Sequence, residues 1–321
     1  MPGILIESPF LVERLAGWAP AGCRIFCPAD LTGGVTADIA ESVEVLVTGG
    51  GPLPNTLVDA LPKLRLVACF STGYAGIDLA HLRARGIALT SASGVNAHDV
   101  ADHALALLLS WWHGIPAADR LVRSGGWREG IAPRRSLRGV RAGVVGLGRI
   151  GQAVAVRLSA HEMAVRWWGP RDKPEAPYER ARSLLDLARQ SDVLVVTSRA
   201  TPDNAGQISA EILQALGPAG VLVNVSRGFL VDEAALLAAL DSGAIAGAAL
   251  DVFADEPTDP DRWRDRRNVV VTPHLAGYTR EAGQDMLEQI RENVRRYLAG
   301  ESLLSAVNDP AGPCPGFSAT S

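Results

Sequence analysis

The sequence lacks several features that would place it in a special class of protein. Its 321 residues include four cysteines without the spacing of zinc ligands, so we expect reduced thiols in a cytoplasmic protein. No apolar run is long enough for a transmembrane helix, and no secretory signal or membrane partner is expected. The formal net charge is −4 and no long basic run occurs, so nucleic acid is not an expected partner.

Short apolar runs alternate with helical patterns through most of the chain, which is long enough for two domains. This alternation predicts an α/β fold with mainly parallel sheets. The predicted strands of the first part are residues 3–7, 24–27, 43–47, 64–69 and 87–90. Those of the second part are residues 142–146, 164–168, 193–197, 221–224, 246–250 and 269–272.

The most informative motif is Gly146-Leu147-Gly148-Arg149-Ile150-Gly151, which follows a predicted strand and opens a helical pattern. Gly146 would permit a tight turn, Gly148 would let the backbone approach a pyrophosphate, and Gly151 would let helix and strand pack closely. The helix N-terminus, with Arg149 and Ile150, would present N–H groups to the phosphates. The motif therefore predicts a dinucleotide site in a doubly wound, Rossmann-type domain.

Three further residues follow predicted strands of the same domain, at the edge where open α/β sheets bind ligands. His274 could exchange a proton with an alcohol or carbonyl oxygen, because histidine titrates near neutrality. A carboxylate from Glu256 would fix the tautomer of this imidazole, and Arg227 could bind a carboxylate with its guanidinium fork. Taken one at a time, these residues could also be a packing histidine, a surface acid and a solvated arginine.

Six segments together closely resemble the signatures of the D-2-hydroxyacid dehydrogenase family, in the right order and over nearly the whole chain. They are residues 70–78, 94–102, 146–151, 224–228, 250–257 and 272–277. The resemblance implies an NAD(P)-dependent oxidoreductase without a metal. It also implies two doubly wound α/β domains, a Rossmann dinucleotide-binding domain and a flavodoxin-like substrate domain.

The domain boundaries also follow from this resemblance. It implies a discontinuous substrate domain over residues 1–97 and 286–321, and a dinucleotide-binding domain over residues 98–285. Residues 309–321 carry three prolines, Pro310, Pro313 and Pro315, among glycines, so we expect a disordered tail. In this family the helix around residues 101–112 commonly supports a homodimer, which is therefore the expected assembly.

The resemblance implies a role for each site residue. His274 would donate the proton when a 2-oxo acid is reduced, Glu256 would orient it, and Arg227 would grip the substrate. The backbone N–H groups of Thr72 and Gly73 would hold the other side of the substrate carboxylate. Asp251 would lie near the nicotinamide carboxamide.

Cofactor choice is predicted from the end of the second Rossmann strand, where a domain that prefers NAD carries an acidic residue. Here Gly169 takes that place and makes room for a 2′-phosphate, with which Arg171 can pair. Arg199 could stack on the adenine or reach the same phosphate. Asp172 keeps NAD possible, because a shifted turn could present it to the ribose. We therefore expect NADP, with NAD possible.

The implied substrate is a small 2-oxo acid of the glyoxylate or hydroxypyruvate type, and the product is the D-2-hydroxy acid. A 2-ketogluconate reductase and an aromatic 2-oxoacid reductase are the alternatives. A dinucleotide-sensing binding protein, like the transcriptional corepressors that share this fold, is the alternative from another class. Turnover of NADPH with a panel of 2-oxo acids separates enzyme from binding protein.

Overall fold

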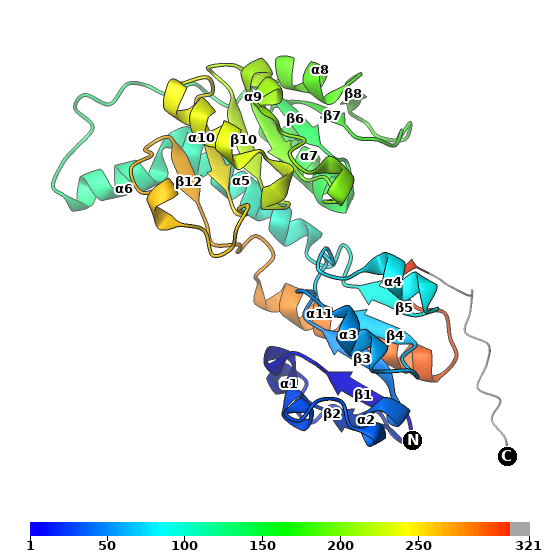
Figure 1. The fold of residues 1–321 in the computed structure, drawn as a ribbon. Helices are drawn as coiled ribbons and strands as arrows, with labels where there is room; N and C mark the ends of the chain where they lie inside the picture. Colours follow the sequence, from blue (N-terminus) through cyan, green and yellow to red (C-terminus); the bar gives the residue numbers. More distant parts are fainter. Residues whose placement is uncertain (309–321) are drawn as a thin grey trace. The chain divides into compact units, whose positions relative to one another are not determined.

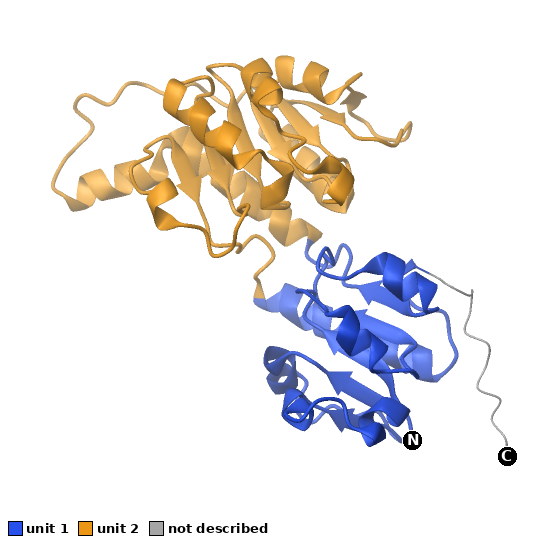
Figure 2. Cartoon of the chain, in the orientation of Figure 1, with its two compact units in different colours: residues 1–96, 280–321 blue, residues 97–279 orange. Residues whose placement is uncertain are grey.

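The computed structural model describes residues 1–308, which form two compact units (Figure 1, Figure 2). Unit 1 combines residues 1–96 with the chain from Arg280 onward, and unit 2 is the continuous stretch Ala97–Thr279. Each unit has its own mainly parallel sheet, so the predicted α/β class is confirmed. Residues 309–321, for which the sequence predicts a disordered tail, lie outside the described residues.

The sheet of unit 1 has the strand order β13-β5-β4-β3-β1-β2. All its neighbouring strands are parallel except β13, which runs antiparallel to β5. The order β2-β1-β3-β4-β5 is that of flavodoxin-like domains, as predicted. The strands are β1 (Gly3–Ile6), β2 (Arg24–Phe26), β3 (Val43–Thr48), β4 (Leu66–Cys69), β5 (Ala88–Ser91) and β13 (Ala306–Asn308).

The longest helix of unit 1 is α11 (Arg280–Leu298), which covers one face of its sheet. Leu287, Ile290 and Val294 recur at helical spacing and are buried with Ile4 and Val45 of the strands. The other helices of the unit are α1 (Pro9–Arg14), the 3₁₀ helix η1 (Pro28–Leu31), α2 (Ala37–Ser42), α3 (Asn55–Asp59) and α4 (Leu79–Ala84).

The sheet of unit 2 is parallel throughout, in the order β12-β11-β10-β9-β6-β7-β8. Numbered from β6, this contains the Rossmann order 3-2-1-4-5-6 with one further strand at the edge. The strands are β6 (Arg141–Val145), β7 (Ala164–Trp168), β8 (Glu179–Arg180), β9 (Val193–Val196), β10 (Val221–Asn224), β11 (Gly247–Leu250) and β12 (Val269–Val271).

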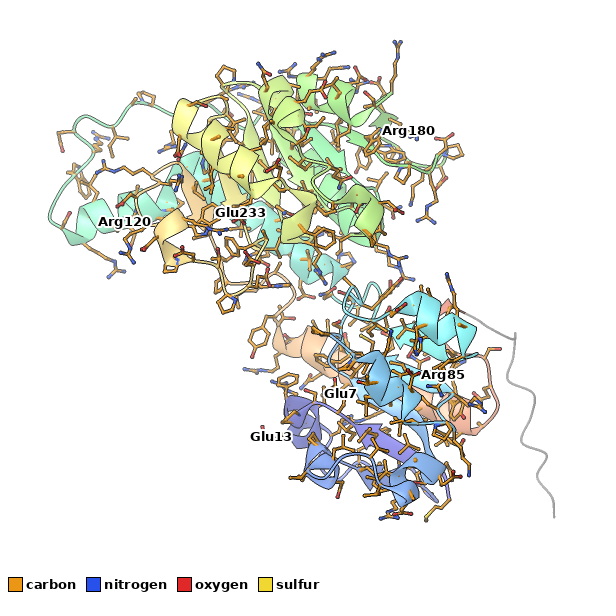
Figure 3. The ribbon with its side chains drawn as sticks, viewed as in Figure 1. Glu7, Glu13, Arg85, Arg120, Arg180 and Glu233 are labelled. Atoms are coloured by element: carbon orange, nitrogen blue, oxygen red, sulfur yellow. The ribbon has the colours of Figure 1, made fainter. Side chains whose placement is uncertain are left out.

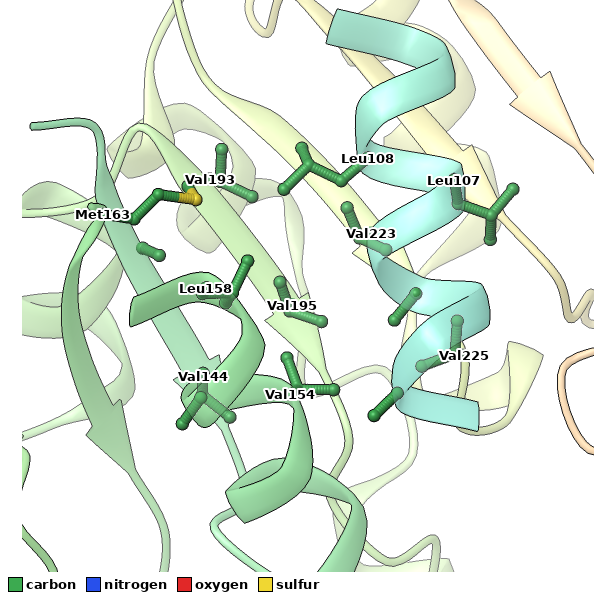
Figure 4. Packing of buried hydrophobic residues seen from close by; sticks show 14 of the residues in the cluster. Leu107, Leu108, Val144, Val154, Leu158, Met163, Val193, Val195, Val223 and Val225 are labelled. Atoms are coloured by element: carbon green, nitrogen blue, oxygen red, sulfur yellow. The ribbon is translucent and has the colours of Figure 1, made fainter. Parts of the chain in front are cut away.

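Helices cover both faces of this second sheet. Leu108 of α5 and Leu158 of α7 share a buried cluster with Val195 and Val223 of the strands (Figure 4). The helices are α5 (Ala97–His113), α6 (Ile115–Arg123), α7 (Arg149–Ala160), α8 (Leu184–Arg189), α9 (Ala210–Leu216) and α10 (Glu233–Ser242). The unit also has three 3₁₀ turns, η2 (Pro202–Asn204) and η3 (Gly228–Leu230) between these helices and η4 (Pro260–Arg262) after α10.

Some further properties can be stated for residues 1–308. None of the helices there combines the length and the apolar character that crossing a bilayer requires. Cys23, Cys27 and Cys69 are free thiols, and burial raises the pKa of each. Within the same range no three His, Cys, Asp or Glu side chains are grouped to hold a metal ion.

Candidate active site

The glycine motif forms the turn between β6 and α7. Gly146 has φ +93, and a Cβ there would lie 2.4 Å from the Cα of Ser198. A Cβ on Gly151 would lie 2.0 Å from the carbonyl oxygen of Gly146, so this turn excludes larger residues at both positions. Gly148, the N-cap of α7, has no atom within 4 Å of its ideal Cβ position. This open space at a helix N-terminus fits a pyrophosphate.

Gly169 directly follows β7, at the place where an NAD-preferring domain carries an acidic residue. A Cβ on Gly169 would make only an ordinary contact, 3.5 Å from the Trp167 ring. Arg180 donates from Nη2 to the Gly169 carbonyl at 2.8 Å, and its guanidinium lies 5.6 Å from the centre of a Trp167 ring (Figure 3). Arg171 is exposed, and Asp172 lies 3.7 Å from Nη1 of Arg180. Cationic groups therefore gather where an NAD-preferring domain would carry an acid.

The sequence predicts a cofactor contact for Arg199, but it does not indicate that Arg180 lies beside Gly169. Arg199 is exposed in the loop after β9, where its carbonyl accepts a hydrogen bond from Nδ2 of Asn204 at 2.8 Å. Arg180 lies on β8, which has two residues and follows a segment with Pro174 and Pro177. So short a strand has no recognisable periodicity, and the sequence pattern therefore does not place Arg180 near Gly169.

His274 and Glu256 come together at the ends of β12 and β11. Nδ1 of His274 lies 2.6 Å from Oε2 of Glu256, while Oε1 of Glu256 accepts the Phe253 N–H at 3.0 Å. Because a carboxylate only accepts, Nδ1 carries a hydrogen, and Nε2 is the nitrogen left to act on a substrate. The two side chains are 44% and 36% exposed, so the pair is open to a ligand.

A second carboxylate braces the loop that carries Glu256. Oε2 of Glu233, at the start of α10, accepts the Ala254 N–H at 3.0 Å, and its other oxygen pairs with Arg262 (Figure 3). Asp232 caps α10 through the Ala235 N–H, whereas Glu233 is 10% exposed and holds the loop.

Arg227 follows β10 and is half-buried beside the same loop. Its Nη1 donates to the Ser226 carbonyl at 2.6 Å. A Cβ on Gly228 would lie 1.8 Å from the carbonyl carbon of Phe253, so glycine is needed where the two loops touch. Burial lowers the pKa of the Arg227 guanidinium and the nearby Glu256 carboxylate opposes this, so the group stays cationic.

Asp251, at the end of β11, is completely buried. Its carboxylate accepts from Thr272 Oγ1 at 2.6 Å and from the N–H groups of Leu275 and Ala276 at 2.7 and 2.8 Å. Nε2 of His103 lies 3.3 Å from the same carboxylate. Both oxygens are thus engaged within the chain, and the role of Asp251 beside the nicotinamide stays a prediction.

Thr72 and Gly73 belong to unit 1, in the loop after β4. The Ser71 hydroxyl donates to the Gly73 carbonyl, and the Ser71 carbonyl accepts the Ala92 N–H at 3.1 Å. These bonds set the path of the backbone at the carboxyl end of the sheet. The contact of both residues with a substrate carboxylate stays a prediction.

Known proteins resemble this chain along most of its length. Residues 105–276 match the family described as D-isomer specific 2-hydroxyacid dehydrogenase, NAD binding domain. A hydroxyphenylpyruvate reductase of Plectranthus scutellarioides is 38% identical over 270 residues, which are 84% of this chain and 86% of that protein. The 2-ketogluconate reductase of Gluconobacter oxydans is 37% identical over 84% of this chain and 88% of its own.

Solved structures show the same relationship. The NADPH-dependent glyoxylate/hydroxypyruvate reductase of Sinorhizobium meliloti, in complex with NADP and malonate, aligns with a TM-score of 0.85 at 36% identity. The alignment covers 96% of this chain and 97% of that one. With the Rossmann strand order and the paired His274 and Glu256 already described, these matches show that the chain belongs to the D-isomer specific 2-hydroxyacid dehydrogenase family of NAD(P)-dependent oxidoreductases.

Proposed function

We propose that this enzyme reduces small 2-oxo acids of the glyoxylate and hydroxypyruvate type to D-2-hydroxy acids, with NADPH as the reductant. The observation that carries the chemistry is the 2.6 Å contact between His274 and Glu256 at the carboxyl edge of the sheet. Arg227 adds a half-buried cation close to this pair. The name of the structurally similar Sinorhizobium enzyme supports both the substrate class and the cofactor.

Each site residue has a defined task in this proposal. The reduced nicotinamide, when bound, supplies the hydride. His274 donates the proton from Nε2 to the carbonyl oxygen, while Glu256 holds Nδ1–H and stabilises the imidazolium. Arg227 binds the substrate carboxylate and stabilises negative charge that develops on the oxygen. The N–H groups of Thr72 and Gly73 in unit 1 would also bind the substrate carboxylate, which would make unit 1 the substrate domain.

The preference for NADPH rests on the surroundings of β6 and β7. The turn with Gly146, Gly148 and Gly151 and the first N–H groups of α7, from Arg149 and Ile150, would hold the pyrophosphate. Arg171 would pair with the 2′-phosphate beside Gly169, and Arg199 would stack on the adenine or reach the same phosphate. Asp172 accepts the Lys173 N–H at 2.9 Å and lies near Arg180, which favours its staying away from the ribose.

The relatives named as a hydroxyphenylpyruvate and a 2-ketogluconate reductase favour two alternative substrates. The test is kcat/KM for glyoxylate, hydroxypyruvate, hydroxyphenylpyruvate and 2-ketogluconate with NADPH and with NADH. The two small acids with NADPH should give the highest values. A higher value for either larger acid would replace the proposed substrate, and NADPH binding without turnover of any acid would favour a dinucleotide-sensing protein.

We also infer a homodimer, with α6 and the loop after it in the interface. No residue of α6 is buried, and Ile115 and Val122 on it are 54% and 56% exposed. Trp127 and Ile131 in the following loop are 64% and 50% exposed. Apolar side chains gathered in this way are typical of a surface that a second copy covers. The free cysteines support a cytoplasmic location.

A further inference from the structure

A cluster of polar side chains lies behind the loop that carries His274, and the proposed chemistry does not use it. The cluster consists of His103 on α5, Asp251 after β11 and Thr272 after β12. The Asp251 side chain is 0% exposed and that of His103 is 23% exposed. Buried polar groups of this kind are costly unless each finds a partner, so their hydrogen bonds identify what they hold.

The donors and acceptors in this cluster can be assigned from its geometry. Thr272 Oγ1 lies 2.6 Å from Oδ1 of Asp251, and the ionised carboxylate only accepts, so the hydroxyl donates its single hydrogen there. Nε2 of His103 lies 2.9 Å from the same hydroxyl oxygen. Because that hydrogen is already used, Nε2 of His103 must be the donor to Thr272. His103 therefore carries a hydrogen on Nε2, which also faces Asp251 at 3.3 Å.

Asp251 in turn determines the path of the backbone around His274. Its carboxylate accepts the N–H groups of Leu275 and Ala276, the two residues after His274. Its carbonyl accepts the His274 N–H at 2.8 Å. His274 itself has φ +54, a left-handed backbone that a side chain rarely adopts. A small displacement of Asp251 would therefore turn the imidazole away from its working direction.

We propose that His103 is a positioning residue: by donating to Thr272 and Asp251, it holds the loop 272–276 so that His274 presents Nε2 for proton transfer. This inference rests on the proposed role of His274. α5 packs on β11 and β12, the two strands that precede the loops with Glu256 and His274. His103 therefore lies on a helix, which holds a side chain more precisely than a loop does.

The electrostatics of Asp251 agree with this assignment. Burial on its own would raise the pKa of the Asp251 carboxyl, but hydrogen bonds from His103, Thr272 and the amides of Ala276 and Leu275 lower it below its usual value. The carboxylate therefore stays ionised and keeps all four donors.

The test compares two substitutions at one position in the full-length enzyme. His103→Leu removes the donor and keeps an apolar side chain, whereas His103→Gln keeps an N–H donor near the place of Nε2. We expect kcat for glyoxylate reduction to fall on the order of ten- to a hundred-fold in His103→Leu, because misplaced catalytic groups cost that much. The deuterium-oxide isotope effect on kcat should rise, because proton transfer becomes slower. His103→Gln should recover most of kcat.

Two readouts separate positioning from loss of the fold or of the proposed function. Amide exchange measured by mass spectrometry should accelerate over residues 272–276 in His103→Leu, while NADPH affinity, followed by tryptophan fluorescence, stays unchanged. Unchanged kcat and exchange in His103→Leu would overturn the proposal, as would a parallel loss of NADPH affinity and stability in both variants. If His274→Ala retains activity, the proposed role of His274 as proton donor fails, and amide exchange of this loop still shows whether His103 holds it.

Discussion

At the residue scale, His274 occupies a backbone region that side chains rarely adopt, with φ +54. Such a conformation costs on the order of 1–3 kcal/mol and persists only where the surroundings impose it. Here the two amides that follow, from Leu275 and Ala276, are both bound by the buried Asp251 carboxylate. The hydrogen bonds to Asp251 therefore compensate the strain at His274, the residue that we propose as the proton donor.

Replacing this histidine should remove the chemistry and spare the cofactor. His274→Ala should lower kcat by on the order of 10²–10⁴, because a general acid contributes about that much, with the Kd for NADPH unchanged. Steady-state kinetics and fluorescence titration measure the two effects. His113→Ala, which removes an exposed histidine at the end of α5, is the matched control and should leave both unchanged. Turnover retained by His274→Ala would assign the proton to another group.

Cofactor choice should depend on the arginine after β7. Arg171→Ala should weaken NADPH by on the order of ten- to a hundred-fold and leave NADH nearly unchanged, because only NADPH offers a 2′-phosphate. Gly169→Asp should deepen this loss, and a Cβ at that position would make only ordinary contacts, the nearest 3.5 Å from the Trp167 ring. Isothermal titration with each cofactor measures the effect, and Arg189→Ala, another exposed arginine, is the control. Equal weakening of both cofactors would contradict the assignment.

At the element scale, an ion-pair cluster fastens β6 to β9 at the amino edge of the sheet, away from the site. Oδ1 of Asp192 accepts a hydrogen bond from Nη2 of Arg141 at 2.7 Å, and Oδ2 of Asp192 lies 3.3 Å from Nη2 of Arg135. The side-chain hydrogen bond from Arg141 is the main cause that lowers the pKa of Asp192 to about 2. A carboxyl whose pKa is lower in the folded state stabilises the fold above its unfolded pKa, and this stabilisation disappears as pH falls through the folded pKa.

Asp192→Asn should therefore reduce the free energy of unfolding at pH 7 by on the order of 1–2 kcal/mol, allowing for the exposed arginines. The difference from wild type should stay constant down to about pH 4 and shrink between there and about pH 2. Urea unfolding at several pH values measures it, and kcat should not change. A difference that grows as pH falls would show that the carboxylate is not what stabilises the edge.

The helix α6 offers a second test at this scale. Val122→Glu should dissociate the proposed dimer, because a desolvated charge would oppose covering of the apolar face. Light scattering after size exclusion gives the mass directly. Val156→Glu on α7 is the matched control, since Val156 is 59% exposed and Val122 56%. A wild-type monomer, or a dimer that tolerates Val122→Glu, would contradict the interface.

Two strands of the sheet of unit 2 have their predicted bounds. The strand at 221–224 is an apolar run whose four residues are all buried. The strand at 164–168 was also predicted with its observed bounds, although only Trp167 on it is buried. β8 and β13 were not predicted, since two or three residues at a sheet edge form no pattern. α6 was not predicted either, because it buries no side chain within the chain.

The same distinction holds for the site. His274, Glu256 and Arg227 stand in family-like motifs at strand ends, so the resemblance could propose them. The bond between His103 and Thr272 joins residues 169 positions apart and depends on how α5 is rotated on its sheet. Such a contact follows from packing rather than from local pattern, which is why the sequence indicated neither His103 nor Glu233 as a support of the site.

At the scale of the whole molecule, the chain leaves unit 1 after residue 96 and returns to it at Arg280. The return supplies α11 and then β13, which closes the edge of the first sheet at β5. Asn308 fastens that edge with its side chain, which accepts the Leu89 N–H at 2.6 Å and donates to the Ile87 carbonyl at 2.9 Å. The partners are 219 and 221 positions apart.

During synthesis on the ribosome, this connectivity makes the order in which the two units can fold the reverse of the order in which they begin to be translated. Unit 2 is an uninterrupted stretch and can fold as soon as it has emerged, whereas the first 96 residues must wait for α11 and β13. Until then the β5 edge is an open template for strands of other nascent chains. Residues 1–96 therefore leave the exit tunnel before unit 2 and become native after it, with the β5 edge exposed in the interval.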